Sequence, residues 1–193
     1  MEWDQRYSAK DLVWGAGPNH FVVREFTGMP PGRALDLAAG EGRNALWLAE
    51  QGWQVLALDF SRVAVERGRR LAAERGVDVN WVVADVLSAH LPDGGFDGVL
   101  VAYLHLPAPR RAAVLARAAA ALAPGGTLLV VGHDRSNLGD GVGGPQDPDV
   151  LYTPDEIVAA LPGLTIRRAE TALRPVDGSA VPARDTVVVA TRS

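Results

Sequence analysis

The stretch LDLAAGEGRNALWLA, residues 35–49, joins an apolar run to an amphipathic one through a loop with two glycines. Gly40, Gly42 and Ala45 satisfy the pattern G-x-G-x-x-[G/A] directly after an expected strand and at the start of an expected helix. Gly40 permits a tight turn, Gly42 lets a ligand approach the backbone, and the small Ala45 allows close packing of helix on strand. A turn without a ligand is the structural alternative. The spacing alone does not say which nucleotide-bearing cofactor the loop would hold.

Composition limits the class of protein. The chain has 193 residues, 48% apolar and 22% charged, with a formal net charge of −4. This length suits one domain with a sizeable core, and the negative charge disfavours nucleic acid as a partner. There are no cysteines, which excludes disulfides and thiol nucleophiles and fits a reducing cytoplasm. No signal-peptide core or membrane span of ~18 apolar residues is present, so we expect a cytoplasmic protein without a membrane partner.

Strand-like and helix-like segments alternate from residue 33 almost to the end. Apolar runs predict strands at 33–38, 53–59, 79–85, 96–104 and 127–133, and helical spacing predicts helices at 43–52, 61–76 and 109–122. We interpret the three arginines of RRAAVLAR (110–117) as a solvated helix face. Near-continuous apolar runs are typical of parallel strands buried on both faces. The pattern predicts an α/β fold, a Rossmann-like doubly wound, mostly parallel sheet with helices on both faces.

The pattern changes after His133. Residues 134–150 form a loop rich in Gly, Asp and Pro that is longer than a plain connector, and Thr153 is placed to cap a helix over 153–161. Apolar runs at 164–173 and 184–192 have only loop between them, so we expect the last two of seven strands to pair antiparallel. No boundary divides the chain, and we predict a single domain over 1–193.

Residues around the glycine loop narrow the choice of cofactor. Asp59 ends the next expected strand, at about the ~20-residue spacing of a carboxylate that binds a ribose. A phosphate-binding loop for ATP is excluded because AAGEGRNA has no Lys-Ser/Thr pair. Asp36 lies in the strand before the loop, where a carboxylate would repel the pyrophosphate of NAD. The same carboxylate suits the ammonium and sulfonium groups of S-adenosylmethionine (SAM), so this charge argument favours SAM.

The same stretch resembles the first motif of class I SAM-dependent methyltransferases, in which an acidic residue precedes the glycine loop. The resemblance runs from about residue 33 to the C-terminus and includes VADV (83–86), FDGVLV (96–101) and LAPGG (122–126). It implies that Asp59 binds the ribose hydroxyls, that Asp85 bonds the adenine amino group, and that Val86 or Leu87 packs on the adenine. One departure is Ala38, where the family usually has its first loop glycine. The predicted cofactor-binding residues are Asp36, Ala38, Gly40, Gly42, Arg43, Asn44, Asp59, Phe60, Asp85, Val86 and Ala102.

The N-terminal stretch WDQRYSAKDLVWGAGPNHFV (3–22), together with GRNALWLA, is similar to small bacterial methyltransferases of the tellurite-resistance and thiopurine-methyltransferase-like branch. This resemblance implies that a segment over 1–32 covers the cofactor site and that the Rossmann-like core occupies 33–193. Aromatic side chains of the segment would then face the sulfonium or a substrate, or else only attach the segment to the core. These side chains are Trp3, Tyr7, Trp14 and Phe21.

Candidate catalytic residues lie at the expected ligand edge of the sheet. His105 follows the fourth strand and His133 ends the fifth, at the carboxyl edge where open α/β sheets bind ligands. Tyr103 lies close by in the sequence. Each is a candidate for substrate-side chemistry, with a structural role as the alternative. The spacing of these groups does not indicate a metal site, and we expect none.

Together these expectations favour methyl transfer from SAM to a small-molecule O, N, S or metalloid nucleophile by in-line displacement, leaving S-adenosyl-L-homocysteine. Two alternatives remain open. An NAD(P)-dependent oxidoreductase would share the glycine loop and Asp59, and a non-catalytic SAM-binding module would keep every cofactor residue. We expect a monomer or a homodimer, and the acceptor is not identified by the sequence.

Overall fold

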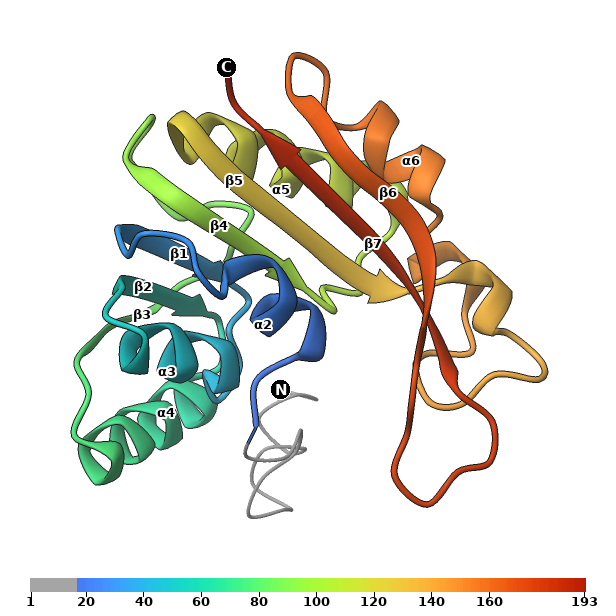
Figure 1. Cartoon of the computed structure of the whole chain (residues 1–193), viewed down its shortest axis with the longest axis horizontal. Helices are drawn as coiled ribbons and strands as arrows, with labels where there is room; N and C mark the ends of the chain where they lie inside the picture. The colour runs from blue at the N-terminus through green and yellow to red at the C-terminus, as the bar shows by residue number, and fades with distance from the viewer. Residues whose placement is uncertain (1–16) are drawn as a thin grey trace.

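The computed structural model describes residues 17–193, which form a seven-stranded sheet with helices on both faces (Figure 1). The strand order is β3-β2-β1-β4-β5-β7-β6. Strands β1 to β5 pair in parallel, whereas β7 is antiparallel to both β5 and β6. The predicted Rossmann-like sheet with a C-terminal antiparallel pair is confirmed. The strands are β1 (Arg33–Leu37), β2 (Gln54–Asp59), β3 (Val79–Val83), β4 (Phe96–Ala102), β5 (Leu122–His133), β6 (Thr165–Arg174) and β7 (Ala183–Thr191).

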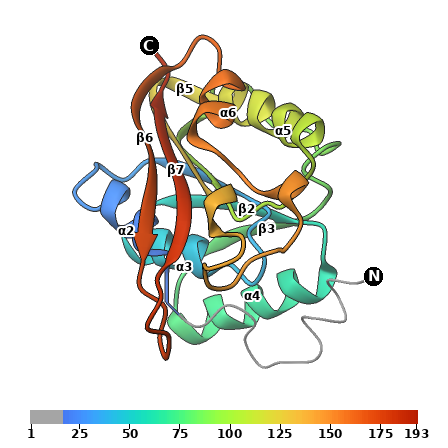
Figure 2. The ribbon, with the colours of Figure 1, turned by 90° about the vertical axis from the view of Figure 1, so that its right-hand side faces the viewer.

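Helices cover the two faces separately (Figure 2). Helices α2 (His20–Phe26), α3 (Arg43–Glu50) and α4 (Arg62–Arg75) pack on one face, and α5 (Ala108–Ala121) and α6 (Pro154–Ala159) pack on the other. Two short 3-10 helices, η1 (Arg135–Asn137) and η2 (Pro148–Val150), lie in the long loop after β5. No helix in the described part of the chain is long and apolar enough to cross a bilayer.

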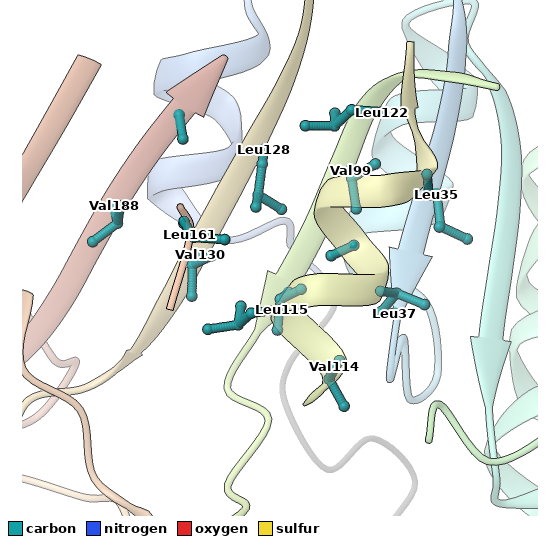
Figure 3. Close-up of a cluster of buried hydrophobic side chains, with 14 of the residues drawn as sticks. Leu35, Leu37, Val99, Val114, Leu115, Leu122, Leu128, Val130, Leu161 and Val188 are labelled. Carbon is teal, nitrogen blue, oxygen red and sulfur yellow. The ribbon is translucent and has the colours of Figure 1, made fainter. Parts of the chain in front are cut away.

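The core beneath α5 and α6 explains why the central strands have nearly continuous apolar sequences. Leu115 and Val114 of α5 pack onto the central strands, and Leu161 follows α6 into the same cluster (Figure 3). Leu35 and Val99 contribute from β1 and β4 and have no exposed surface. Side chains of the same strands fill a second cluster on the opposite face. Because both faces are buried, alternation with polar residues is absent from the central strands.

Predicted helix caps are present. The Ser61 side chain accepts from the backbone N–H of Ala64 at 3.2 Å and begins α4, and Gly76 ends that helix with a left-handed backbone. The Thr153 side chain accepts from the Glu156 N–H at 3.3 Å and begins α6. Such caps satisfy N–H groups that the first helical turn leaves without partners. These helix starts were predictable because each depends on neighbouring residues.

Three features differ from the predictions. Strand β5 begins at Leu122 rather than at residue 127, because the APGG segment is an irregularity within the β4–β5 pairing and not only a turn. Helix α2 was not predicted. The interpretation of 110–117 as a solvated face is wrong for Arg111, which is buried, lies 4.6 Å above the Tyr152 ring and pairs with Glu156 at 3.3 Å.

Candidate active site

The glycine loop lies where the strand order reverses. Strand β1 pairs with β2 on one side and with β4 on the other, and ligands of open α/β sheets bind beyond the carboxyl ends of the strands at such a point. Ala38, Gly40 and Gly42 all have left-handed backbones, with φ of 59°, 59° and 81°. A left-handed alanine is strained. The conformation therefore explains why a glycine at position 38 is usual in the family that the sequence resembles.

Gly42 is required by packing. It is the N-cap of α3, and a Cβ atom there would lie 2.1 Å from the Trp81 ring. A Cβ at Gly68 of α4 would meet the same ring at 2.3 Å. The indole thus lies between the two helices only because both positions lack a side chain. Packing against Trp81 is therefore one reason for a glycine at position 42, and the approach of a ligand to its backbone stays a prediction.

Asp59 organises the loop from the end of β2. Its buried carboxylate accepts the backbone N–H groups of Gly40 and Ser61, each at 2.8 Å. An ionised carboxylate only accepts hydrogen bonds, so a group at this position suits donors such as backbone N–H groups and hydroxyls. The next residue, Phe60, is 50% exposed, which is unusual for a phenylalanine beside a strand end and offers a flat apolar surface at this edge.

Asp36 is a buried carboxyl group near the same loop. Burial, followed by the charge of Asp59, raises the pKa of Asp36 to about 7, although Arg43 and the N–H of Ala45 act in the opposite direction. Its Oδ2 atom is buried and has no hydrogen-bond partner within residues 17–193. An acceptor oxygen in this state is costly unless a donor reaches it. The site therefore fits a ligand that carries a cationic donor, as the ammonium group of SAM does.

The remaining predicted cofactor residues have different surroundings. Asp85 is exposed and accepts the N–H of Leu87 at 2.9 Å, whereas Val86 is buried in the core beneath α5. Leu87 is only partly buried, so of the two residues expected to pack on adenine it has the more open position. Ala102 is half-buried at the end of β4.

Arg43 and Asn44 begin α3 and connect the loop to other elements. The Asn44 side chain accepts the backbone N–H of Asn19 at 2.8 Å, and Asn19 in turn caps α2. The Arg43 guanidinium lies 5.8 Å from the centre of the Tyr103 ring, and its charge also acts on Asp36. Arg43 thus lies between the glycine loop and a second group of polar residues.

That second group brings the three candidate catalytic residues together. The ring centres of Tyr103 and His133 are 5.0 Å apart, and those of Tyr103 and His105 are 6.3 Å apart. The two imidazoles are stacked, with centres 5.5 Å apart and an interplanar angle of 12°. Burial, followed by the neighbouring His133, lowers the pKa of His105 to about 4. At pH 7 His105 is therefore neutral.

Two residues missed by the sequence reasoning join these side chains. Oδ2 of Asp185 accepts the Tyr103 hydroxyl at 2.8 Å and Nε of Arg174 at 2.6 Å. Nδ1 of His133 lies 3.3 Å from Oδ1 of the same carboxyl group, which is fully buried. We call Tyr103, His105, His133, Arg174 and Asp185 the acceptor cluster. No local signal identifies Asp185, because its neighbours Arg184 and Thr186 are also polar, and its position opposite His133 follows only from the β5–β7 register.

Backbone strain and a loop further define the acceptor cluster. Tyr103 directly follows β4 with φ of 56°, which is rare for an aromatic residue, and its N–H donates to the Val131 carbonyl at 2.7 Å. Residues in such conformations gather at functional sites. Gly144, in the loop after β5, packs on the His133 ring, and a Cβ there would lie 2.6 Å from it. The long loop thus forms part of the wall around His133.

Of the four aromatic side chains predicted to face the sulfonium or a substrate, the structure describes Phe21. Phe21 is 1% exposed and packs in the core cluster on the face of α2 and α3, so its role is attachment of the segment. Trp3, Tyr7 and Trp14 lie outside the described residues. Within residues 17–193 no three His, Cys, Asp or Glu side chains converge in a way that could hold a metal ion.

Comparison with known proteins agrees with this geometry. Residues 34–126 match the model of the methyltransferase domain family. The chain is 39% identical over 103 residues to a demethylmenaquinone methyltransferase of Thermus thermophilus, covering 52% of this chain and 47% of the relative. It is 32% identical over 117 residues to a 2-heptyl-1-hydroxyquinolin-4(1H)-one methyltransferase of Mycobacteroides abscessus, covering 59% and 52%. The chain therefore matches about half the length of each relative.

A solved structure shows the same fold. TehB from Haemophilus influenzae superposes with a TM-score of 0.75 at 16% identity, over 91% of this chain and 62% of that one. The sheet order, with the glycine loop at the strand reversal, is that of an open Rossmann-like α/β sheet. Together with the match of residues 34–126 to the methyltransferase domain family, the comparisons show that this chain is similar to methyltransferases over about half of its length and has their fold.

Proposed function

We propose that this protein transfers the methyl group of SAM to a small-molecule acceptor at the carboxyl edge of β1, β2, β4 and β5. The observation that carries the proposal is the buried Asp36 carboxyl, whose Oδ2 has no partner within residues 17–193. SAM would supply an activated methyl group on a sulfonium. The relative from M. abscessus is named for a hydroxylated heteroaromatic compound, which supports a small, ring-shaped acceptor here.

The chain's own residues would hold the cofactor by distinct contacts. Asp36 would face the ammonium group, and Asp59 would accept the ribose hydroxyls while it continues to hold the N–H of Gly40. Phe60 and Leu87 would pack on the adenine, beside Asp85. The segment before residue 33 would cover this site. Because the sulfonium is already reactive, the protein contributes mainly alignment, exclusion of water and management of the acceptor's proton.

Ligand-induced stabilisation tests the proposal against the nicotinamide alternative. We expect SAM and S-adenosylhomocysteine to raise the melting temperature, since a ligand that binds only the native state stabilises it. NADH and NADPH should leave the melting temperature unchanged. Stabilisation by a nicotinamide nucleotide and by neither SAM species would contradict the proposal. Turnover of SAM with a panel of acceptors then separates an enzyme from a silent SAM-binding module.

A variant of Asp59 tests the cofactor contacts directly. Hydrogen bonds to charged groups contribute ~1.5–3 kcal/mol each, so Asp59→Asn should weaken S-adenosylhomocysteine binding by at least about tenfold in calorimetry. Asp78→Asn is the matched control, because Asp78 is exposed and precedes β3 at the opposite edge of the sheet. Unchanged affinity in Asp59→Asn would show that the ribose contact is assigned to the wrong residue.

A further inference from the structure

We propose that His133, supported by Asp185, is the general base of this site and that the acceptor group is an aromatic hydroxyl. The inference rests on the proposed function, because a base matters here only if a methyl group is transferred. The observation behind this inference is the arrangement of buried groups around His133. Cofactor binding alone does not require that arrangement. The acceptor cluster supplies residues from the ends of β4, β5 and β6 and from β7.

The first step concerns which nitrogen of His133 carries the lone pair. His133 and Asp185 are direct cross-strand partners, with Nδ1 3.3 Å from Oδ1. Burial alone would raise the pKa of Asp185, but His133 and Arg174 lower it below its ordinary value, so this carboxyl is ionised at neutral pH. A carboxylate only accepts hydrogen bonds. The 3.3 Å contact lacks the geometry of a hydrogen bond, but a bare lone pair on Nδ1 would face the lone pairs of Oδ1, so the contact favours the proton on Nδ1 and leaves Nε2 as the nitrogen that can accept a proton.

The second step concerns which imidazole takes a proton. Two stacked imidazoles disfavour double protonation, because like charges at short distance repel. Asp185 lies beside His133, whereas Arg111 adds a positive charge near His105. The centre of the Tyr103 ring lies 5.0 Å from that of His133, and the Tyr103 hydroxyl and Arg174 both donate to the Asp185 carboxylate. His105 is the less suitable base, because burial and the neighbouring His133 lower its pKa to about 4, whereas His133 is the imidazole in direct contact with a carboxylate.

The third step concerns the acceptor. An aromatic hydroxyl has a pKa of about 10, as tyrosine does, so at pH 7 it is protonated and weakly nucleophilic. A positioned base accelerates such a reaction by about 10²–10⁴-fold, while a carboxylate acceptor needs no base and a thiol, with a pKa of about 8.5, needs less help. Tyr103 and His105 place two further rings beside His133, and aromatic rings pair favourably with one another, which favours an aromatic acceptor.

The proposed step balances in atoms and electrons. The O–H bond of the acceptor breaks, and its proton moves to Nε2 of His133. The oxygen lone pair forms a bond to the methyl carbon as the carbon–sulfur bond breaks, and that electron pair remains on sulfur. Asp185 stabilises the imidazolium, which then releases its proton to solvent.

A series of phenols tests the inference. Wild type and His133→Gln are compared on phenols whose pKa ranges from below 7 to about 10, with SAM saturating. We expect the variant to lose at least about 100-fold in rate on phenols near pKa 10 and less than about tenfold on phenols ionised at pH 7. Added imidazole should partly restore His133→Ala. His90→Gln is the control, since His90 is exposed in a connector before β4.

The outcomes separate the inference from the proposed function. Retained S-adenosylhomocysteine binding shows that the His133 variants are folded, and if they are not, Asp185→Asn is measured in the same series. An equal rate loss across all phenols overturns the inference, as does wild-type methylation of amines, thiols or carbon without methylation of any phenol. Both results leave the proposed function intact. Absence of S-adenosylhomocysteine binding to wild type overturns the proposed function itself.

Discussion

The glycine loop and the acceptor cluster lie beside each other but are built in opposite ways. The contact that shapes the loop, from Gly40 to Asp59, joins residues 19 positions apart. The contact that shapes the cluster, from Tyr103 to Asp185, joins residues 82 positions apart. The loop depends on one strand–turn–helix unit and the next strand end. The acceptor cluster depends on the position of β7 between β5 and β6 in the sheet. The glycine loop is therefore determined by residues close together in the sequence, and the acceptor cluster by the order of the strands.

The largest effect we expect comes from the local region. Gly42→Ala forces a left-handed alanine, at ~1–2 kcal/mol, and displaces the Trp81 ring, which adds the ~1–3 kcal/mol of overpacking. Denaturant unfolding should therefore show a loss of about 2–5 kcal/mol. Gly76→Ala is the matched control, because Gly76 is also left-handed at a helix end but has open space at its Cβ, so it should cost only the ~1–2 kcal/mol of the left-handed backbone. Equal losses would mean that Trp81 does not depend on Gly42.

The two regions should also respond to pH with opposite signs. Asp36 has a raised pKa of about 7, so the native state binds more protons than the unfolded state between about pH 4 and 7, and stability falls as pH rises through this window. His105 has a lowered pKa of about 4, so the unfolded state binds more protons up to about pH 6.5, and stability rises. Each slope is at most ~1.4 kcal/mol per pH unit.

Single variants separate the contributions of Asp36 and His105 to the pH dependence of the free energy of unfolding. Asp36→Asn should remove the falling contribution and leave a steeper rise from pH 4 to 6.5, whereas His105→Gln should remove the rise and leave a steeper fall. The measurement is the free energy of unfolding in urea at intervals from pH 4 to 8. If both variants change the profile in the same direction, the two buried groups do not have the opposite environments described above.

A smaller effect is expected at the wall of the acceptor cluster. Arg111 lies over Tyr152, donates to the Leu106 carbonyl and pairs with a partly exposed Glu156. Arg111→Ala should cost about 2 kcal/mol of stability through lost cation–π contact and packing. The neighbouring Arg110→Ala should change stability by less than about 0.5 kcal/mol, because Arg110 is exposed. Similar losses in both variants would restore the solvated-face interpretation.

These contrasts explain what could be predicted from the sequence. The strands, the caps at Ser61 and Thr153 and the antiparallel end of the sheet follow from local patterns, and all are present. The burial of Arg111 and the contact between His133 and Asp185 depend on elements that meet only in the folded sheet. Sequence reasoning identified His133 as a candidate but had no local signal for its partner.

Proton release on cofactor binding tests the central claim most directly. If the ammonium group of S-adenosylhomocysteine lies against Asp36, the nearby positive charge lowers the pKa of that carboxyl from about 7. Calorimetric titration at pH 6.5 in buffers of different ionisation enthalpy should then show net proton release by wild type and none by Asp36→Asn. Binding without proton release, or equal release by both proteins, would contradict the assignment of Asp36 to the cofactor.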